Sequence, residues 1–433
     1  MTAALQRPFA SLSVPNYRRY FAGQVVSLSG NWVQIVAETW LILQLTDSAM
    51  AVGVNTALQF APLLLFGAFG GLLADRFDKR RLLMVTQAAM VVPAVALWAL
   101  ATAGAVEPWM VFALVFVRGS FLAVDNPTRQ SFVIEMVGPD RVVNAVSLNS
   151  ALVHMARMAG PAVAGILIAT VGVEPCFLVN AATFAAMLVA LRRMRPSELT
   201  RPVPTQRRRG ALREALRYVA ATPALAVPLA MMALVGTLAF NFQVLLPLLA
   251  RFSFHGGSGS YATFVIAMGA GSVVGALVAG ARGRVSPQLL IASSAAFGLC
   301  TLLAALAPTL ALASIALALT GAASVTFAAG VNSALQLAVE PAMRGRVMAL
   351  YMMMFMGGTA FGAPLIGLLA ELFGARWSLI GGGLITLVGT AVSTLLLARG
   401  RGVGGREAAL ARRAQTAPEQ IEDDRISDVA QRP

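Results

Sequence analysis

Long apolar runs recur along the whole of this chain, and they leave few folds open to it. A helix rises about 1.5 Å per residue, so about 20 apolar residues cross the roughly 30 Å hydrocarbon layer of a bilayer. Only 12% of the residues are charged, whereas a soluble domain carries about 25%. The short alternating segments of a membrane β-barrel are not found. The sequence therefore predicts an all-α membrane protein with many spans.

We predict twelve transmembrane helices in two six-helix halves. Their expected bounds are 20–45, 50–74, 82–104, 109–134, 143–171, 174–192, 224–250, 260–281, 288–307, 309–337, 346–373 and 377–398. Residues 1–192 are expected to form the first bundle and residues 223–398 the second, joined by the basic cytoplasmic linker 193–222. Within the linker, 210–221 is expected to form an amphipathic helix on the membrane surface. The polar residues 399–433 are expected to be a disordered cytoplasmic tail.

The basic residues predict the orientation in the membrane. The formal net charge is +14, and Lys and Arg gather in the N-terminus, the 75–81 loop, the linker and the C-terminal tail. The alternate loops carry acidic residues, namely Asp47, Glu107, Glu174 and Glu371. Basic loops remain on the cytoplasmic side of a membrane. We therefore expect a multi-pass protein of the cytoplasmic (inner) membrane with both termini inside. Anionic lipid headgroups are a sufficient partner for the positive charge of the protein, so nucleic acid is not expected as a partner.

The two halves share a pattern of glycines. Three glycines of the first half have counterparts at a constant offset of 202 residues, pairing Gly160 with Gly362, Gly165 with Gly367 and Gly172 with Gly374. Transporters that rock two halves about a site at the membrane midplane are built from such internal repeats.

The loop predicted between the second and third spans reads GGLLADRFDKRR. It resembles the loop signature of the major facilitator superfamily in Gly71, Asp75, Arg76, Lys79 and Arg80. Asp78 replaces the usual Gly. The resemblance implies that Asp75 and Lys79 engage neighbouring helix ends and latch the outward-facing state, and Asp125 in the fourth span is the expected acidic partner. The alternative is a solvated loop that is basic only because it is cytoplasmic.

A second motif lies in the fifth predicted span, which reads ARMAGPAVAG. Gly160, Pro161 and Gly165 resemble the antiporter motif of the same superfamily, from which Ala156 and Ala164 depart. That motif accompanies exporters, and small residues of this kind let membrane helices pack closely. The sequence from about residue 10 to residue 400 is similar to the branch of the superfamily that holds the enterobactin exporter and macrolide efflux pumps. The resemblance implies export of organic molecules by a monomer.

The first span carries a polar stripe that ends in a carboxylate. Gln24, Ser27, Asn31, Gln34 and Glu38 follow helical spacing and share one face. An ionisable group in hydrocarbon is costly and is a functional hypothesis by default. We hypothesise that Glu38 couples transport to protons, because burial disfavours its charge and a nearby Arg favours it. The alternatives are a static ion pair and an outer-end residue in water.

Three further residues complete the expected coupling set. Arg118 resembles the superfamily's arginine in the fourth span and is the first candidate partner of Glu38, and Arg157 is the alternative. His154 shares a face with Arg157, although a hydrogen-bonded packing role competes with a coupling role for it. The arginines would suit an anionic substrate and the carboxylate a cationic one.

The resemblance also implies which helices line the substrate cavity, namely spans one, four, seven and ten. This nominates the polar contacts Asn31, Gln34, Asn241, Gln243, Asn332 and Gln336. We expect no cofactor and no metal site, and we do not expect an enzyme. Lys79 is the one lysine and lacks a phosphate-binding loop, which argues against an ATP-driven pump. The prediction is a secondary active exporter, a proton antiporter for drugs or lipophilic compounds; the alternative is a dedicated exporter of one metabolite such as a siderophore.

Overall fold

The computed structural model describes residues 7–199, 211–282, 286–340 and 343–396, and all regular secondary structure in these ranges is helical. The first half contains α2 (Pro15–Thr46), α3 (Ala49–Arg76), α4 (Lys79–Thr102), α5 (Pro108–Val137), α6 (Val142–Val171) and α7 (Glu174–Arg192). The second half contains α8 (Ala211–Ala221), α9 (Pro223–Leu238), α10 (Phe242–Leu248), α11 (Ser258–Arg282), α12 (Pro287–Leu306), α13 (Leu310–Ala338) and α14 (Arg344–Phe373). A last helix, Ala375–Leu396, follows α14.

Ten helices of the described part are long and apolar enough to cross a membrane. The polar-faced α2 and the helix α6 are not among these full-length spans, but they contain 32 and 30 residues. At about 1.5 Å per residue both exceed the thickness of the hydrocarbon layer. The all-α membrane fold is confirmed, and the total of twelve spans stays a prediction.

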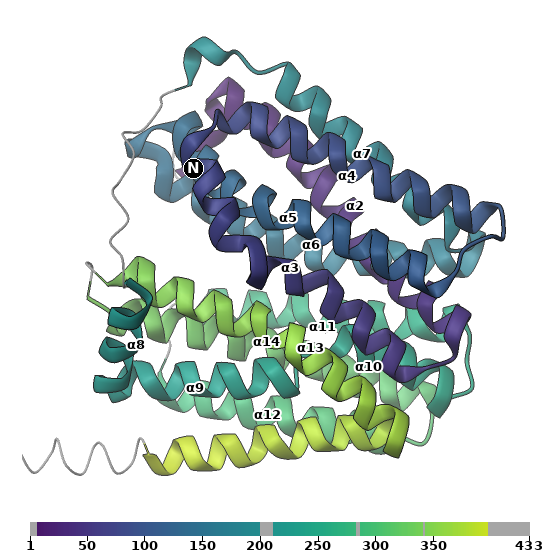
Figure 1. Cartoon of the computed structure of the whole chain (residues 1–433). Helices are drawn as coiled ribbons and strands as arrows, with labels where there is room; N and C mark the ends of the chain where they lie inside the picture. Colours follow the sequence, from purple (N-terminus) through teal and green to yellow (C-terminus); the bar gives the residue numbers. More distant parts are fainter. Residues whose placement is uncertain (1–6, 200–210, 283–285, 341–342, 397–433) are drawn as a thin grey trace, which may run out of the picture.

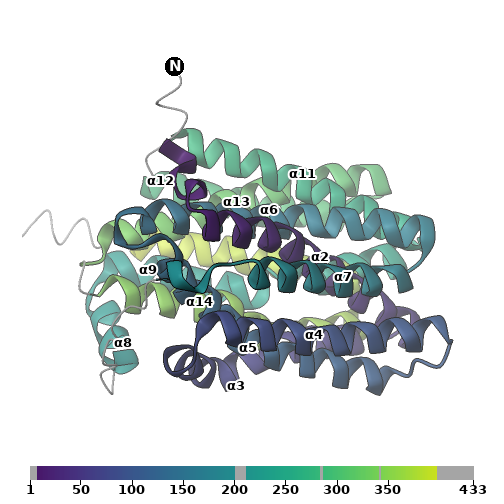
Figure 2. The same ribbon diagram turned by 90° about the horizontal axis from the view of Figure 1, so that it is seen from above.

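The helices form two bundles that lie side by side (Figures 1 and 2). In Figure 1 the first half is drawn from purple to teal and the second from teal to yellow, and α8 lies at one end. The bundles meet chiefly along two seams, where α14 packs on α3 and α11 packs on α6. The tail after residue 396 and residues 200–210 of the linker fall outside the described residues.

The glycine repeat has a packing reason. A Cβ on Gly165 would lie 2.8 Å from the Cα of Ala262 on α11, and one on Gly367 would lie 2.7 Å from the carbonyl oxygen of Ala49 on α3. These two glycines therefore bring the backbones of opposite halves together at equivalent places. Gly160 and Gly362 do the same within each half, because a Cβ there would clash with Trp32 of α2 and with Thr237 of α9.

We expect Gly362→Ala to lower the stability of the protein. The added Cβ would overlap the carbonyl oxygen of Thr237, and such overpacking costs about 1–3 kcal/mol. The measurement is thermal unfolding of the purified protein in detergent. Gly381→Ala is the matched control, because no neighbouring atom lies within 4 Å of its Cβ position and Ala is favoured over Gly in a helix. Equal melting temperatures for the two variants would contradict the clash.

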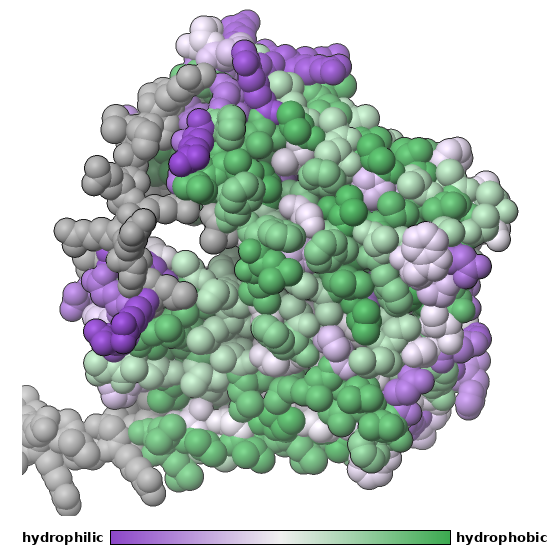
Figure 3. All heavy atoms as spheres, in the orientation of Figure 1, coloured by the Kyte–Doolittle hydropathy of each residue, from purple (hydrophilic) through white to green (hydrophobic). Residues whose placement is uncertain are grey.

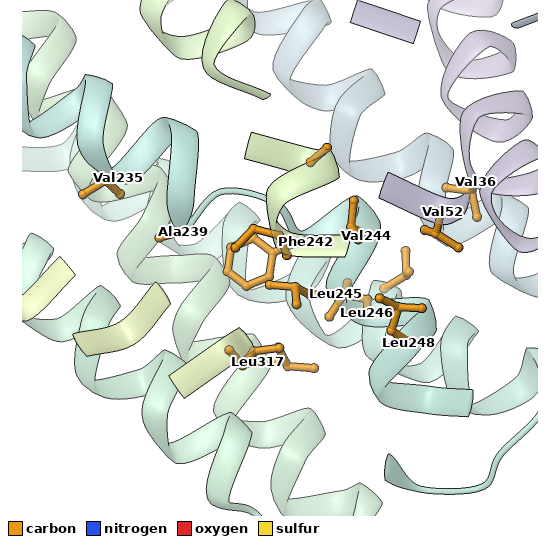
Figure 4. Close-up of a cluster of buried hydrophobic side chains, with 14 of the residues drawn as sticks. Val36, Val52, Val235, Ala239, Phe242, Val244, Leu245, Leu246, Leu248 and Leu317 are labelled. Atoms are coloured by element: carbon orange, nitrogen blue, oxygen red, sulfur yellow. The ribbon is translucent and has the colours of Figure 1, made fainter. Parts of the chain in front are cut away.

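The seventh predicted span is interrupted, which the sequence prediction of one helix over 224–250 missed. Helix α9 ends at Leu238, α10 begins at Phe242, and a π-helix, Leu249–Ser253, follows. At the break the side-chain Nδ2 of Asn241 donates to the carbonyl oxygen of Thr237 at 2.6 Å. This side-chain bond takes the acceptor that the backbone of a continuous helix would use. Figure 4 shows the apolar side chains of α10 between Leu317 and the valines Val36 and Val52 of the first half.

Helix α8 forms where the linker was expected to be helical. Ala215 and Val219 are buried against the bundle, while Glu214 pairs with Arg346 of α14 at 2.8 Å. The hydroxyl of Tyr218 accepts the backbone N–H of Glu340 at 3.2 Å. The described part of the linker is therefore docked on the second half.

The two ends of the molecule differ. At one end Arg251 pairs with Asp47 across the halves at 3.0 Å, and Trp40 stacks on Tyr261 with ring centroids 5.3 Å apart. A carboxylate of the second half, Glu371, accepts the first backbone N–H groups of α3, from Ala49 at 2.6 Å and from Met50 at 3.1 Å. At the other end, which carries α8, Figure 3 shows an opening between the halves.

Candidate functional site

A buried ion pair lies inside the first half. The guanidinium of Arg118 on α5 contacts both carboxylate oxygens of Glu38 on α2, with Nη2–Oε2 at 2.6 Å and Nε–Oε1 at 3.1 Å. Both side chains are 0% exposed. Arg118 is thus a partner of Glu38, as the first of the two alternatives expected. The side chains of Arg157 and His154 lie outside the described residues, and nothing here tests their predicted role.

Amide side chains surround this pair. Gln34 donates to Oε1 of Glu38 at 2.7 Å, and Gln59 of α3 approaches Oε2 at 3.5 Å. Asn31 accepts from Nη1 of Arg118 at 2.7 Å. Behind Gln34, Asn180 of α7 donates to its Oε1. Every described side chain that hydrogen-bonds to the Glu38 carboxylate does so through an N–H donor.

Close helix contacts bring these groups together. A Cβ on Gly119, next to Arg118, would lie 2.9 Å from the carbonyl oxygen of Gln59, so α5 approaches the backbone of α3 at this level. A Cβ on Gly30 would clash with Thr183 and lie 2.8 Å from Oδ1 of Asn180. Because Gly30 and Gln34 are one helical turn apart, the same close approach of α7 to α2 sets the contact between Asn180 and Gln34.

The hydrogen bonds of the ion pair are complete. Removing two charges from water costs several kcal/mol per ion, and their attraction offsets this only when the hydrogen bonds are complete. Here both carboxylate oxygens are occupied and the guanidinium has three acceptor contacts, two on Glu38 and one on Asn31. The pair therefore joins α2 to α5 in the interior of the first half.

The predicted substrate contacts fall into three places. Asn31 and Gln34 belong to the ion-pair site, and Asn241 and Gln243 flank the start of α10. Asn332 and Gln336 of α13 hydrogen-bond to each other, and Gln336 is exposed. Among the described residues several buried polar atoms lack a partner on helices that meet at the junction of the halves: Trp40 Nε1, Asn55 Nδ2 and Oδ1, Gln59 Oε1, Asn241 Oδ1 and Gln243 Oε1. Buried polar atoms are normally paired with protein or water, and the atoms named here lie on helices of both halves.

A family model described as a transmembrane secretion effector matches residues 6–419 of the chain. The chain belongs to this family of the major facilitator superfamily.

Curated relatives of this family member are transporters. It is 26% identical over 88% of its length to the enterobactin exporter EntS of Citrobacter koseri, covering 92% of that protein. It is 24% identical over 85% of its length to macrolide efflux protein A of Streptococcus pyogenes, covering 93% of that protein. The match to the staphyloferrin A transporter of Staphylococcus aureus is 28% identical, spanning 40% of this chain and 44% of that protein.

Solved structures agree on the fold. A bacterial homologue of the human lysosomal transporter Spinster, in an inward-facing and unoccupied conformation, superposes with a TM-score of 0.72 at 15% identity, over 88% of this chain and 97% of that chain. The nucleoside transporter NupG gives a TM-score of 0.68 at 11% identity, over 88% of this chain and 99% of that chain. At such low sequence identities, the structural similarity supports the fold and nothing about function. The chain is therefore a multi-pass membrane protein with the major facilitator fold.

The loop that resembles the superfamily signature is a tight connection between α3 and α4. Asp78, which replaces the usual Gly, caps α4 by accepting the backbone N–H of Arg81 at 2.9 Å. Arg80 donates to the last carbonyls of α7, at 2.7 Å to Leu191 and 3.2 Å to Arg192. Gly71 is buried, whereas Asp75 and Arg76 are exposed. Arg80 thus binds the C-terminal end of α7.

The acidic partner of Lys79 is not Asp125, and that expectation was wrong. Lys79 pairs with Glu135 of α5 at 2.6 Å. Asp125 lies deeper, where it pairs with Arg129 and accepts from Thr86 at 2.7 Å. The reason is position along α5, because Glu135 is almost three helical turns closer to the loop than Asp125. The role of this loop as a latch stays a prediction.

The motif that resembles the superfamily's antiporter motif lies in α6. Gly160 faces α2 and Gly165 faces α11, so the motif serves both a contact within the first half and a seam between the halves. Pro161 lies inside the helix between them. Its link to export stays a prediction.

Sequence reasoning missed Gln59 and Asn180. Each is an amide within a predominantly apolar span, in NTALQFAP and CFLVNAAT, and an amide side chain inside a membrane span is the signal that could have found them. Their contact with the Glu38 cluster depends on how α3 and α7 pack around α2, which helical periodicity in one segment does not report.

Proposed function

We propose that this member of the secretion effector family is a secondary active exporter that moves small organic molecules out of the cell in exchange for protons. The observation that carries the proposal is the fully buried Glu38–Arg118 pair with its shell of N–H donors. An ionisable group buried in a membrane span is energetically costly, and such groups mark functional sites by default. We also expect a monomer in the inner membrane, in contact with anionic lipids.

We propose that export proceeds by alternating access of the two bundles. The end closed by Asp47, Arg251 and Glu371 is the one that the basic loops predict to be outside, and the open end carries α8 and the basic linker. The described conformation is then inward-facing with both termini cytoplasmic. Opening the outer end requires the Asp47–Arg251 pair and the Glu371 contacts to separate.

The proton cycle follows from the donor shell. In the inward-facing state Glu38 is ionised and held by Arg118. In the outward-facing state a proton from outside neutralises Glu38 and releases Arg118, and the protonated protein returns to the inward-facing state. There the donors compete with the proton and drive it off to the cytoplasm. The role of His154 and Arg157 in this cycle stays proposed.

Two substrate classes are supported. The similarity to macrolide efflux protein A favours drugs and lipophilic compounds as substrates. The enterobactin exporter and the staphyloferrin A transporter favour a dedicated exporter of a siderophore. The unpaired amide atoms of Asn241 and Gln243 fit the donors of a polar metabolite.

The test measures accumulation of a fluorescent lipophilic cation in cells that express the protein. We expect the protein to lower accumulation several-fold relative to cells with an empty vector, and a protonophore to remove the difference. A difference that survives the protonophore contradicts proton coupling. Accumulation equal to that of empty cells contradicts broad drug efflux, and release of an anionic siderophore is then the substrate assay that decides between the two classes.

A further inference from the structure

The amide pair behind Glu38 is the part of the buried network with no role so far. Asn180 lies on α7 and is 0% exposed. It touches neither the carboxylate nor the guanidinium in any recorded hydrogen bond, but its Nδ2 donates to Oε1 of Gln34. Gln34 in turn donates from Nε2 to Oε1 of Glu38 at 2.7 Å. Asn180 therefore decides which end of the Gln34 amide faces the carboxylate.

A second orientation of the two amides is also complete. The hydroxyl of Thr183 lies 2.8 Å from the backbone oxygen of Asn180 and 2.9 Å from its Oδ1. If both amides turn over, Asn180 donates to the Thr183 hydroxyl, which still donates to the backbone oxygen. Gln34 then donates to Oδ1 of Asn180 and presents its own Oε1 to Glu38. A hydroxyl can accept as well as donate, so no polar atom of the chain loses its partner.

The two orientations suit opposite charge states of Glu38. The described orientation offers an N–H, which stabilises the carboxylate, and the reversed one offers a carbonyl oxygen, which accepts from a protonated carboxyl. Among the described side chains the charged group facing Glu38 is Arg118 of α5, and the neutral ones are Gln34 of α2 and Gln59 of α3. The amide nitrogen of Gln59 is 3.5 Å from the carboxylate. The shorter hydrogen bond from Gln34 therefore has the larger effect on the charge state of Glu38.

We propose that Asn180 is a positioning residue that, through Gln34, holds Glu38 in its ionised form, and that both amides turn over when Oε1 of Glu38 takes up its proton. The proposal rests on the proposed proton coupling by Glu38. It makes the relay Thr183–Asn180–Gln34 a switch with two stable settings. The incoming proton comes from water and bonds to Glu38, and the remaining changes are hydrogen bonds.

The test follows the protonated carboxyl of Glu38 by infrared spectroscopy of the purified protein in lipid nanodiscs, with Glu38→Gln used to assign the band. Asn180→Leu removes the lock while keeping the volume. We expect the pH at which half of the band appears to rise by about one unit, a tenfold gain in proton affinity. Asn180→Ala should shift it in the same direction, which keeps the test open if the Leu variant does not fold.

Two backgrounds separate positioning from packing. In Gln34→Leu the carboxylate no longer feels Asn180, so adding Asn180→Leu should leave the midpoint unchanged. Thr390→Val is the packing control, because it removes a buried hydroxyl partner of Ser294 in the second half and should not move the midpoint. An equal shift in the presence and absence of Gln34 overturns the proposal.

The outcomes also separate this proposal from the proposed function. If the Glu38 band titrates but Asn180→Leu and Asn180→Ala leave its midpoint in place, the switch is overturned and proton coupling stands. If Glu38 stays ionised at every pH in the wild type and in the Asn180 variants, both are overturned.

Discussion

Glu38→Gln is expected to lower protonophore-sensitive efflux at least tenfold. A glutamine of the same shape cannot exchange a proton, so the Arg118 guanidinium would meet the same neutral side chain in both conformations. The energy of the proton gradient then has no group on which to act, because a ligand shifts a conformational equilibrium only through different affinities for the two states. Downhill movement of substrate should persist. The measurement is the initial rate of dye efflux from energised cells.

The control for this change is Glu107→Gln. Glu107 precedes α5 and is an exposed carboxylate without a side-chain cap bond, so its loss should leave efflux intact. Both variants are compared at equal amounts in the membrane. Full protonophore-sensitive efflux by Glu38→Gln would eliminate this residue from the coupling path and leave a static ion pair as its role.

Arg118→Leu is expected to destabilise the protein by about 3–5 kcal/mol, the usual cost of leaving one partner of a buried ion pair alone. Glu38 would keep only its amide neighbours, and Asn31 would lose its donor. The double variant Glu38→Met/Arg118→Leu removes both charges and should recover most of the loss. Neither protein should show proton-driven efflux.

Thermal unfolding of the three proteins in detergent checks this expectation. A single variant that melts with the wild type would mean that the carboxylate is not confined in the apolar interior. A double variant that melts as low as the single one would mean that the loss comes from the shape of the arginine and not from the unpaired charge.

The fold was predictable because a bilayer admits few structures. Long apolar runs have to be helices in lipid, since every backbone polar group needs a partner within the segment. The expected span 82–104 is α4, Lys79–Thr102, and the expected span 174–192 is α7 with the same bounds. The break before α10 was not predictable from apolar periodicity, because periodicity does not report the side-chain bond of Asn241 to Thr237 that lies at the break.

The site was predictable only along single helices. Spacing placed Gln34 and Glu38 on one face of α2, and the choice of Arg118 came from its resemblance to an arginine of the superfamily. The partners contributed by packing were missed, namely Gln59 and Asn180, and Glu135 was overlooked in favour of Asp125. A single sequence reports which groups share a helix face, whereas the angle and depth at which helices meet decide which groups touch.

The paired glycine contacts between the halves have a mechanical consequence. At Gly165 and Gly367 the two bundles touch through backbone and small side chains, so movement at these two points displaces no bulky side chain. Under the proposed rocking, the contacts that must separate lie at one end, where Asp47 has to leave Arg251 and Glu371 has to leave the start of α3. Substitutions at these exposed residues should therefore change the rate of rocking without altering the buried Glu38–Arg118 pair.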